Sequence, residues 1–199
     1  AILLQCDFLR EELPPGEAVE GLAQIETQAD RIRWLVESLL RLSRLDAGVV
    51  PFEKRKLPAR QVIQRAAGGL AGLYLKRNVE LQVDCPEQLN CVCDLEWTAE
   101  ALANLLKNAA EHTPAGGTVR VEYSPQALYS EFRVQNTGPA ILPEDMPHLF
   151  ERFWRGAAAS PGSVGIGLPL ARSIARGQQG DVSAENTPEG PLFRLRLFR

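Results

Sequence analysis

The sequence predicts an α+β sandwich preceded by a helical hairpin. One observation behind this is a long heptad repeat of apolar residues near the start of the chain, a pattern typical of helices that pair lengthwise. The other is a series of short alternating strands after residue 51, partly grouped in hairpins and interspersed with helices. Such a pattern favours helices that cover one face of a mostly antiparallel sheet. We therefore divide the 199-residue chain into residues 1–50 and 51–199.

The bulk composition is that of a globular protein. Hydrophobic residues make up 45% of the chain and charged residues 24%. The formal net charge of -3 argues against a dedicated nucleic-acid binder, which would carry a basic surplus. No apolar run is long enough to span a bilayer, and residues 1–7 do not resemble a signal peptide. Because the first residue is Ala, we expect a piece of a longer protein.

The four cysteines argue against a zinc site. They stand at positions 6, 85, 91 and 93, so none form a C-x-x-C pair, and the chain has only two histidines. We expect reduced thiols in a cytosolic protein.

Residues 18–46 are predicted to form a long helix. Apolar residues recur there at alternating spacings of three and four: Leu22, Ile25, Ala29, Ile32, Val36 and Leu39. A shorter helix over residues 2–13 precedes it, the segment Pro14-Pro15-Gly16 separates the two, and Gly48 ends the second. We favour dimerisation through this seam because it is long. An ordinary helix packed on the core of the same chain is the alternative.

The remaining elements follow from changes of periodicity. Helices are expected over residues 59–76, 95–112 and 167–176, the last ending at Gly177. Strands are expected at residues 79–83, 90–93, 119–123, 128–134, 182–184 and 193–197, with the third and fourth forming a hairpin. A Gly- and Ala-rich loop covers residues 156–167.

The helix at 95–112 carries an unusual polar stripe. Its apolar stripe consists of Leu102, Leu105, Leu106 and Ala109, and its polar stripe of Asn104, Asn108, Glu111 and His112. Asn is a poor helix former, so two of them one turn apart in a helix interior indicate a function. An amide oxygen can ligate Mg²⁺, which keeps waters and phosphate oxygens as its other ligands. Taken alone, the stripe also fits a merely polar helix face.

Three further segments add weak signals of their own. Gly162, Gly165 and Gly167 precede a helix, where free backbone N–H groups favour a phosphate, although a plain loop has the same composition. Residues 136–141 turn sharply after a strand, and the Asn136 side chain there can bond a purine amine while Ile141 packs on the ring; a simple β-turn is the alternative. In residues 150–155 the arginines can face phosphate, whereas the aromatic residues are as typical of a core.

In this order, the four segments resemble the motifs of sensor histidine kinases. Residues 104–109 resemble the N box, 136–141 the first glycine box, 150–155 the F box, and 165–168 the end of the second glycine box. Residues 42–48 are similar to the end of the second helix of that family's dimerisation and phosphotransfer domain. The resemblance covers essentially the whole chain.

The resemblance implies a fold, an activity and a set of partners. The fold is a hairpin that dimerises as a four-helix bundle, followed by a Bergerat-type ATP-binding α/β sandwich. The activity is that of a protein histidine kinase, which transfers the ATP γ-phosphoryl group to a bundle histidine and then to the receiver domain of a response regulator. ATP and Mg²⁺ are the implied cofactors. The chain would be the cytoplasmic portion of a membrane-anchored sensor, with membrane contact only through parts outside it and no nucleic-acid partner.

The same resemblance assigns roles residue by residue. Asn108 would ligate Mg²⁺, Asn104 would support the phosphates, and His112 would lie over the nucleotide. Asn136 matches the residue that reads adenine, and Gly165 and Gly167 would hold the phosphate side. The full predicted nucleotide-binding set is Asn104, Asn108, Glu111, His112, Asn136, Gly138, Ala140, Ile141, Phe153, Arg155, Gly165, Gly167 and Leu168.

The chain departs from the family pattern in several places. The phosphoacceptor histidine and its neighbouring acid are absent, so we assign no catalytic residue and expect no autophosphorylation by this fragment. Asn136 stands where the family has Asp, and losing a charge-assisted bond would cost about 1–2 kcal/mol of binding. Ala140 replaces a Gly, Ser163 and Val164 replace Gly and Thr, and Glu111 stands at a place that is often basic. Residues 156–161 also carry no charge.

These departures keep two alternatives open. The first is a degenerate nucleotide-sensing or scaffolding module with weak or no kinase activity. The second is another ATPase of the same fold, such as a topoisomerase, mismatch-repair or chaperone ATPase, or an anti-sigma serine kinase. The helical hairpin argues against the second, and so does Asn104, because those ATPases use a Glu on the equivalent helix to activate water.

Overall fold

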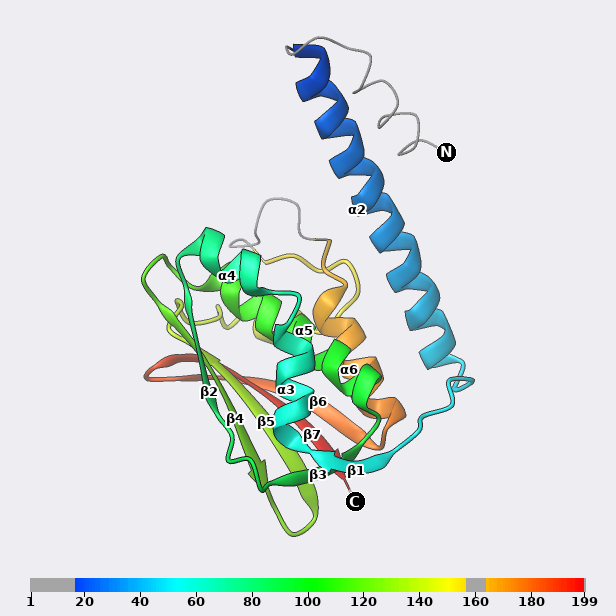
Figure 1. Ribbon diagram of the computed structural model, residues 1–199, viewed down its shortest axis with the longest axis vertical. Helices are drawn as coiled ribbons and strands as arrows, with labels where there is room; N and C mark the ends of the chain where they lie inside the picture. Colours follow the sequence, from blue (N-terminus) through cyan, green and yellow to red (C-terminus); the bar gives the residue numbers. More distant parts are fainter. Residues whose placement is uncertain (1–16, 157–163, 199) are drawn as a thin grey trace. The chain divides into compact units, whose positions relative to one another are not determined.

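The computed structural model describes residues 17–156 and 164–198 (Figure 1). It divides into two compact units with the boundary between Ser43 and Arg44. The helix predicted at residues 2–13 and the turn after it lie outside the described residues. No helix in the described part of the chain is both long and apolar enough to cross a membrane.

The long helix α2 spans Glu17–Asp46, as the heptad pattern predicts. Several seam residues face solvent: Ile25 is 50% exposed, Ile32 61% and Val36 51%. The helix ends in a Schellman motif, in which Gly48 has a positive φ of 66°. The Gly48 N–H donates to the Leu45 carbonyl and the Val49 N–H to the Arg44 carbonyl.

The second unit is built on a five-stranded mixed sheet in the order β2-β4-β5-β7-β6. Its strands are β2 (Glu80–Asp84), β4 (Thr118–Pro125), β5 (Tyr129–Asn136), β6 (Gly180–Thr187) and β7 (Gly190–Phe198). The β4–β5, β5–β7 and β6–β7 pairs are antiparallel, and β2 pairs with β4 in parallel. The predicted α+β class, the mostly antiparallel sheet and the hairpin of β4 with β5 are therefore confirmed.

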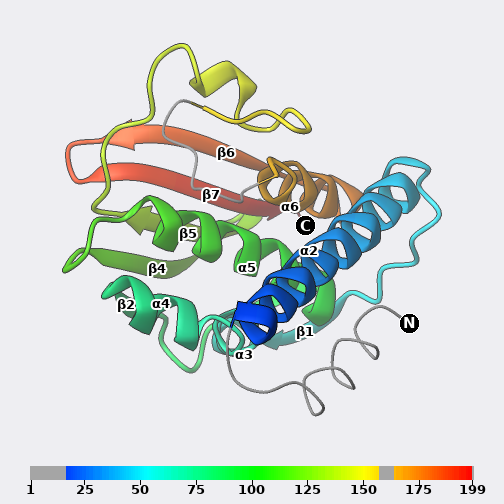
Figure 2. The same cartoon turned by 90° about the horizontal axis from the view of Figure 1, so that it is seen from above.

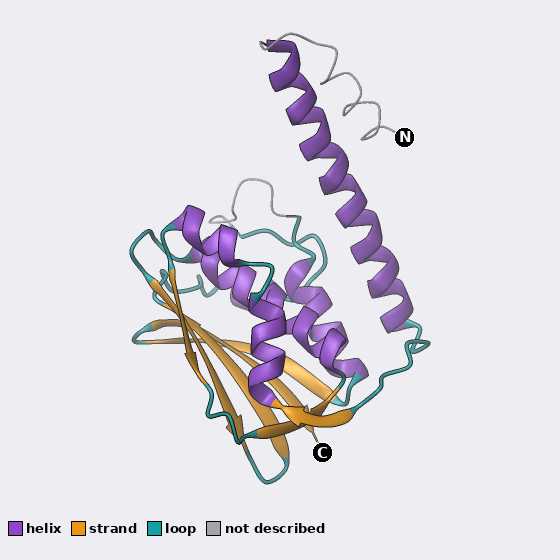
Figure 3. Cartoon of the chain, in the orientation of Figure 1, coloured by secondary structure: helices purple, strands orange, loops and turns teal. Residues whose placement is uncertain are grey.

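The helices of this unit lie on one face of the sheet (Figures 2 and 3). They are α3 (Ala59–Ala67), α4 (Ala71–Arg77), α5 (Leu95–His112) and α6 (Gly167–Gly177). Helix α5 is central, because it packs against α3, α4, α6 and β5. Its predicted apolar stripe is fully buried, with Leu102, Leu105, Leu106 and Ala109 all at 0% exposure.

The structure differs from the predicted elements in two places. Residues 59–76 do not form one helix, because the pair Gly68-Gly69 separates α3 from α4, and glycine is a poor helix former. A second small sheet, β1 (Arg55–Pro58) with β3 (Asn90–Cys93), was also not predicted. Only β3 of that pair shows an alternating apolar pattern; β1 is mostly exposed and ends in a proline.

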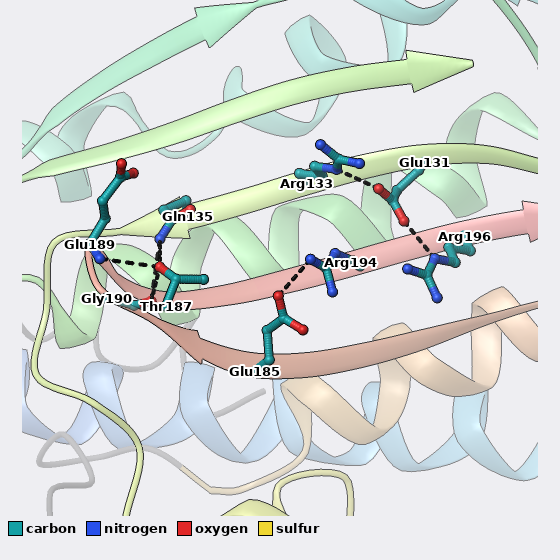
Figure 4. Close-up of polar contacts among 9 residues, drawn as sticks. All are labelled: Glu131, Arg133, Gln135, Glu185, Thr187, Glu189, Gly190, Arg194 and Arg196. Carbon is teal, nitrogen blue, oxygen red and sulfur yellow. Dashed lines mark hydrogen bonds and ion pairs between the residues drawn. The ribbon is translucent and has the colours of Figure 1, made fainter. Parts of the chain in front are cut away.

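The opposite face of the sheet carries a network of ion pairs (Figure 4). At its centre Glu131 is 0% exposed and accepts hydrogen bonds from Arg133 and, at 2.5 Å, from Arg196. Arg194 of β7 pairs with Glu185 of β6 at 2.5 Å. The side chains of β5 and β7 alternate between this charged face and the apolar core, so the network covers the sheet where no helix packs.

The segment before β1 is fixed to the ends of α5 and α6. The Gln178 side chain, 1% exposed, accepts from the Asp94 N–H at 2.8 Å, and its backbone carbonyl accepts from the Lys54 ammonium at 2.5 Å. Phe52 packs edge-on against Trp97 at 5.8 Å between ring centroids. A methyl group at Gly177 would lie 2.6 Å from the Phe52 ring. Gly177 thus ends α6 as predicted, and the structure uses it for close packing.

Candidate nucleotide-binding site

The position of the polar stripe depends on where helix α5 begins, and a side-chain cap fixes that point. The Asp94 carboxylate caps it, accepting from the Trp97 N–H at 3.1 Å and also from the Glu53 N–H at 2.8 Å. The apolar stripe of α5 is buried against the sheet. The stripe that holds Asn104 and Asn108 lies on another side of the helix and is half-buried.

The two asparagines of α5 have different surroundings. The Asn104 amide nitrogen donates to the Glu100 carbonyl at 2.9 Å, which fixes the side chain against its own helix. Its oxygen faces the start of α6, since a methyl group at Gly167 would lie 2.9 Å from Asn104 Oδ1. The Asn108 amide, in contrast, makes no hydrogen bond to any residue in the described ranges, so both its donor and its acceptor are available to a ligand.

The last turn of α5 meets the first glycine segment. A methyl group at Gly138 would lie 2.3 Å from the His112 carbonyl oxygen, so only glycine allows this approach. Burial lowers the pKa of His112, and Arg77 adds to this while Glu111 opposes it. The imidazole is therefore neutral at pH 7 and able to accept or donate one hydrogen bond.

Residues 136–141 are held in place by a contact that the sequence does not reveal. The Ile141 N–H donates to Asn186 Oδ1 and Asn186 Nδ2 donates back to the Ile141 carbonyl, both at 2.9 Å. Asn186 comes from the end of β6, 45 positions away in the chain. In the sequence it precedes Thr187-Pro188-Glu189-Gly190, where an asparagine reads as an ordinary turn residue.

The F-box-like segment is joined to the second glycine segment through the backbone. The Phe153 N–H donates to the Gly165 carbonyl at 2.9 Å. Both residues have a positive φ, 65° for Phe153 and 71° for Gly165, and a methyl group at Gly165 would lie 2.3 Å from the Trp154 carbonyl. Trp154 stacks on His148 at 4.5 Å between ring centroids. The loop between these segments, including Gly162 and Ser163, lies outside the described residues.

The remaining predicted residues make fewer contacts, and most of them are at least partly exposed. The backbone carbonyl of Glu111 accepts from Arg77 at 3.2 Å. Phe153 is 55% exposed, Ala140 and Arg155 are also exposed, and Leu168 is half-buried. The structure thus joins the four segments pairwise around α5, while Arg155 is exposed.

The residues present fit a magnesium ion only together with a ligand. Within residues 17–156 and 164–198 there is no group of three or more His, Cys, Asp or Glu side chains placed to hold a metal. Asn108 can supply one oxygen, and Mg²⁺ typically takes its remaining ligands from water and nucleotide phosphates.

Comparisons with known proteins identify the family. A family model described as histidine kinase-, DNA gyrase B- and HSP90-like ATPase matches residues 93–199. The sensor histidine kinase TrcS of Mycobacterium tuberculosis is 36% identical over 194 residues, 94% of this chain and 37% of that protein. The sensor protein kinase PmrB of Pseudomonas aeruginosa is 29% identical over 191 residues, 96% of this chain and 40% of that protein. The chain therefore spans less than half the length of these relatives.

A solved structure has a similar fold. Full-length ShkA in complex with AMPPNP superposes with a TM-score of 0.80, covering 100% of this chain and 43% of that one at 18% identity. At this identity the likeness concerns the fold alone.

Proposed function

The chain belongs to the family of histidine kinase-, DNA gyrase B- and HSP90-like ATPases, and from this membership we propose that it is the ATP-binding catalytic portion of a two-component sensor histidine kinase. In the proposed reaction the γ-phosphoryl group of ATP passes to a histidine in the dimerisation domain of the whole protein and then to an aspartate of a response regulator. Neither His112 nor His148 is that acceptor, because both lie in the ATP-binding part.

The convergence of the four segments carries this proposal. Gly138 abuts His112, Gly167 abuts Asn104, and Phe153 bonds to Gly165. Segments up to about 60 positions apart are thereby joined around one helix in the order that the sensor kinases use.

The chain's own residues bind and orient the nucleotide in this proposal. Asn136 and Ile141 hold the base, Asn104 supports the phosphates, and Asn108 supplies a Mg²⁺ ligand. The first backbone N–H groups of α6, which no side chain caps, face the phosphates. When bound, Mg²⁺ would neutralise charge that develops on the phosphates. Because the attacking group is the acceptor histidine, the ATP-binding part would contribute positioning and charge stabilisation rather than a nucleophile.

We also propose the arrangement of the whole protein around this site. Residues 1–50 contribute to a dimerising hairpin and residues 51–199 form the catalytic domain. The partners are a second copy of the chain and a receiver domain. The chain is then the cytoplasmic portion of a sensor whose membrane anchor lies in other parts of the protein.

Isothermal titration with ATP tests the proposal. We expect binding at millimolar nucleotide or better that weakens when Mg²⁺ is left out. Asn108→Ala should weaken Mg·ATP binding by about tenfold, or about 1.4 kcal/mol. Asn90→Ala is the matched control, because Asn90 is an exposed amide on β3 and should leave affinity unchanged. No binding at millimolar ATP, or an Asn108→Ala variant with wild-type affinity, would contradict the proposal.

A further inference from the structure

Asn136 places an amide next to apolar residues on its own face of the sheet. It is the last residue of β5 and only 1% exposed. It continues the column of Phe132 and Val134 on the helix-covered face, and its register partner on β4 is Val119. All three of these neighbours are fully buried hydrophobic residues, so the amide is the polar end of an apolar column.

The nitrogen of this amide is an unsatisfied donor. Asn136 Nδ2 is buried and has no hydrogen-bond partner in the described part of the chain. A methyl group at Gly138 would lie only 2.5 Å from it, so the close approach of these two residues requires glycine. Buried donors without acceptors are rare because they lose their hydration without compensation. Turning the amide by 180° would move the nitrogen out of this position, and a ligand acceptor on the other side of the amide would then remove that cost.

We propose that Asn136 makes the base site accept 6-oxopurine nucleotides, with hypoxanthine or guanine as the base, in addition to adenine nucleotides. This inference rests on the proposed function, since it concerns the base of the bound nucleotide. A carboxamide carries both a donor and an acceptor. With its oxygen toward the base it accepts from the 6-amino group of adenine. Turned by 180°, it donates from Nδ2 to the 6-oxo group.

A carboxylate at the same place would discriminate where the amide does not. An ionised Asp has only acceptors, so it bonds a 6-amino group and repels a 6-oxo oxygen. Sites built to hydrogen-bond one group reject an analogue that cannot form the bond far more strongly than sites that only exclude by shape. The neutral amide therefore gives up charge-assisted affinity for adenine and gains tolerance at position 6.

Inosine triphosphate is the cleanest probe of this tolerance. Its base differs from adenine at position 6 and in the proton on N1, both of which an amide turned over can match. Guanine adds a 2-amino group, whose fit depends on other residues. The measurement is displacement of a fluorescent ATP analogue by ATP and by inosine triphosphate, on the chain as it stands and on Asn136→Asp. The two side chains have the same shape, and a thermal melt verifies that the variant is folded.

We expect the wild-type chain to bind the two nucleotides within about tenfold of each other. Asn136→Asp should tighten ATP binding and weaken inosine triphosphate binding, so that ATP is preferred by more than about 100-fold, a change of more than about 1.4 kcal/mol in selectivity. A wild-type preference for ATP above 100-fold would overturn the inference even without the variant. So would equal selectivity in the two proteins. If the wild-type chain binds neither nucleotide, the proposed function itself fails, which is a different result.

Discussion

Glu131 projects from the middle of β5 onto the sheet face opposite the helices, yet its side chain is fully buried. Burial alone would raise the pKa of this carboxyl. Hydrogen bonds from Arg196 and Arg133, together with their charges, outweigh burial and hold the pKa below its usual value. Both arginines donate to this one carboxylate: Arg133 lies two residues further along β5, and Arg196 lies opposite Glu131 on β7.

Replacing Glu131 by Gln should therefore destabilise the protein. The variant leaves two arginines beside a neutral buried group, and we expect a loss of about 2 kcal/mol at pH 7 in urea unfolding. Because the folded pKa lies below the unfolded one, this contribution is present above about pH 4.3 and is lost as the pH falls further toward the folded value.

The acid limb of the stability curve should thus be flatter in Glu131→Gln than in the wild type. Glu185→Gln is the control, since Glu185 forms a similar pair with Arg194 but its side chain is 46% exposed. That pair should be worth less than about 1 kcal/mol. Equal losses in the two variants would contradict the role given to burial.

Single residues also show what sequence alone could predict of the site. Two asparagines one turn apart on α5 were recognisable because Asn disfavours helix interiors. The pair of hydrogen bonds between Asn186 and Ile141 could not be predicted, because nothing local in the sequence links residues so far apart. The buried, unpartnered state of Asn136 likewise depends on its neighbours across the sheet, which only the register supplies.

Among the elements, helices and strands with strong periodicity were predicted correctly, whereas local interruptions of a pattern were missed. The bounds of α5 and β3 and the span of α2 agree with the patterns that predicted them. The prediction of one helix over residues 59–76 was wrong because it gave no weight to the Gly68-Gly69 pair, where α3 ends. Strand β1 carries Arg55, Lys56 and a terminal Pro58, so its pairing with β3 depends on tertiary contacts rather than on propensity.

The exposed seam of α2 leads to a prediction about assembly. If Ile25, Ile32 and Val36 meet a second copy of the chain, Ile32→Asp should convert a dimer into a monomer in sedimentation velocity, because a buried charge would lack a partner. Leu75→Asp is the control: Leu75 is 85% exposed on α4 and should not affect assembly. A wild-type chain that sediments as a monomer throughout the micromolar range would contradict the dimerising role of this seam.

At the scale of the whole molecule, one sheet and one helix organise the site. The sheet buries the apolar stripe of α5, which leaves the stripe with Asn104 and Asn108 available. The turn that follows β5 and the first turn of α6 then approach the same helix through Gly138 and Gly167. The order of the motifs could be predicted from the sequence, but their convergence required the fold. We propose that this convergence forms one nucleotide site.

Whether the three segments form one nucleotide site can be measured from backbone amide chemical shifts recorded while Mg²⁺ and a non-hydrolysable ATP analogue are added. We predict that the largest changes fall in three segments together: residues 104–112, 136–141 and 165–168. The amides of β1 and β3, at the far end of α5, should change little. Changes absent from any of the three segments, or concentrated on β1 and β3, would contradict a single site organised by α5.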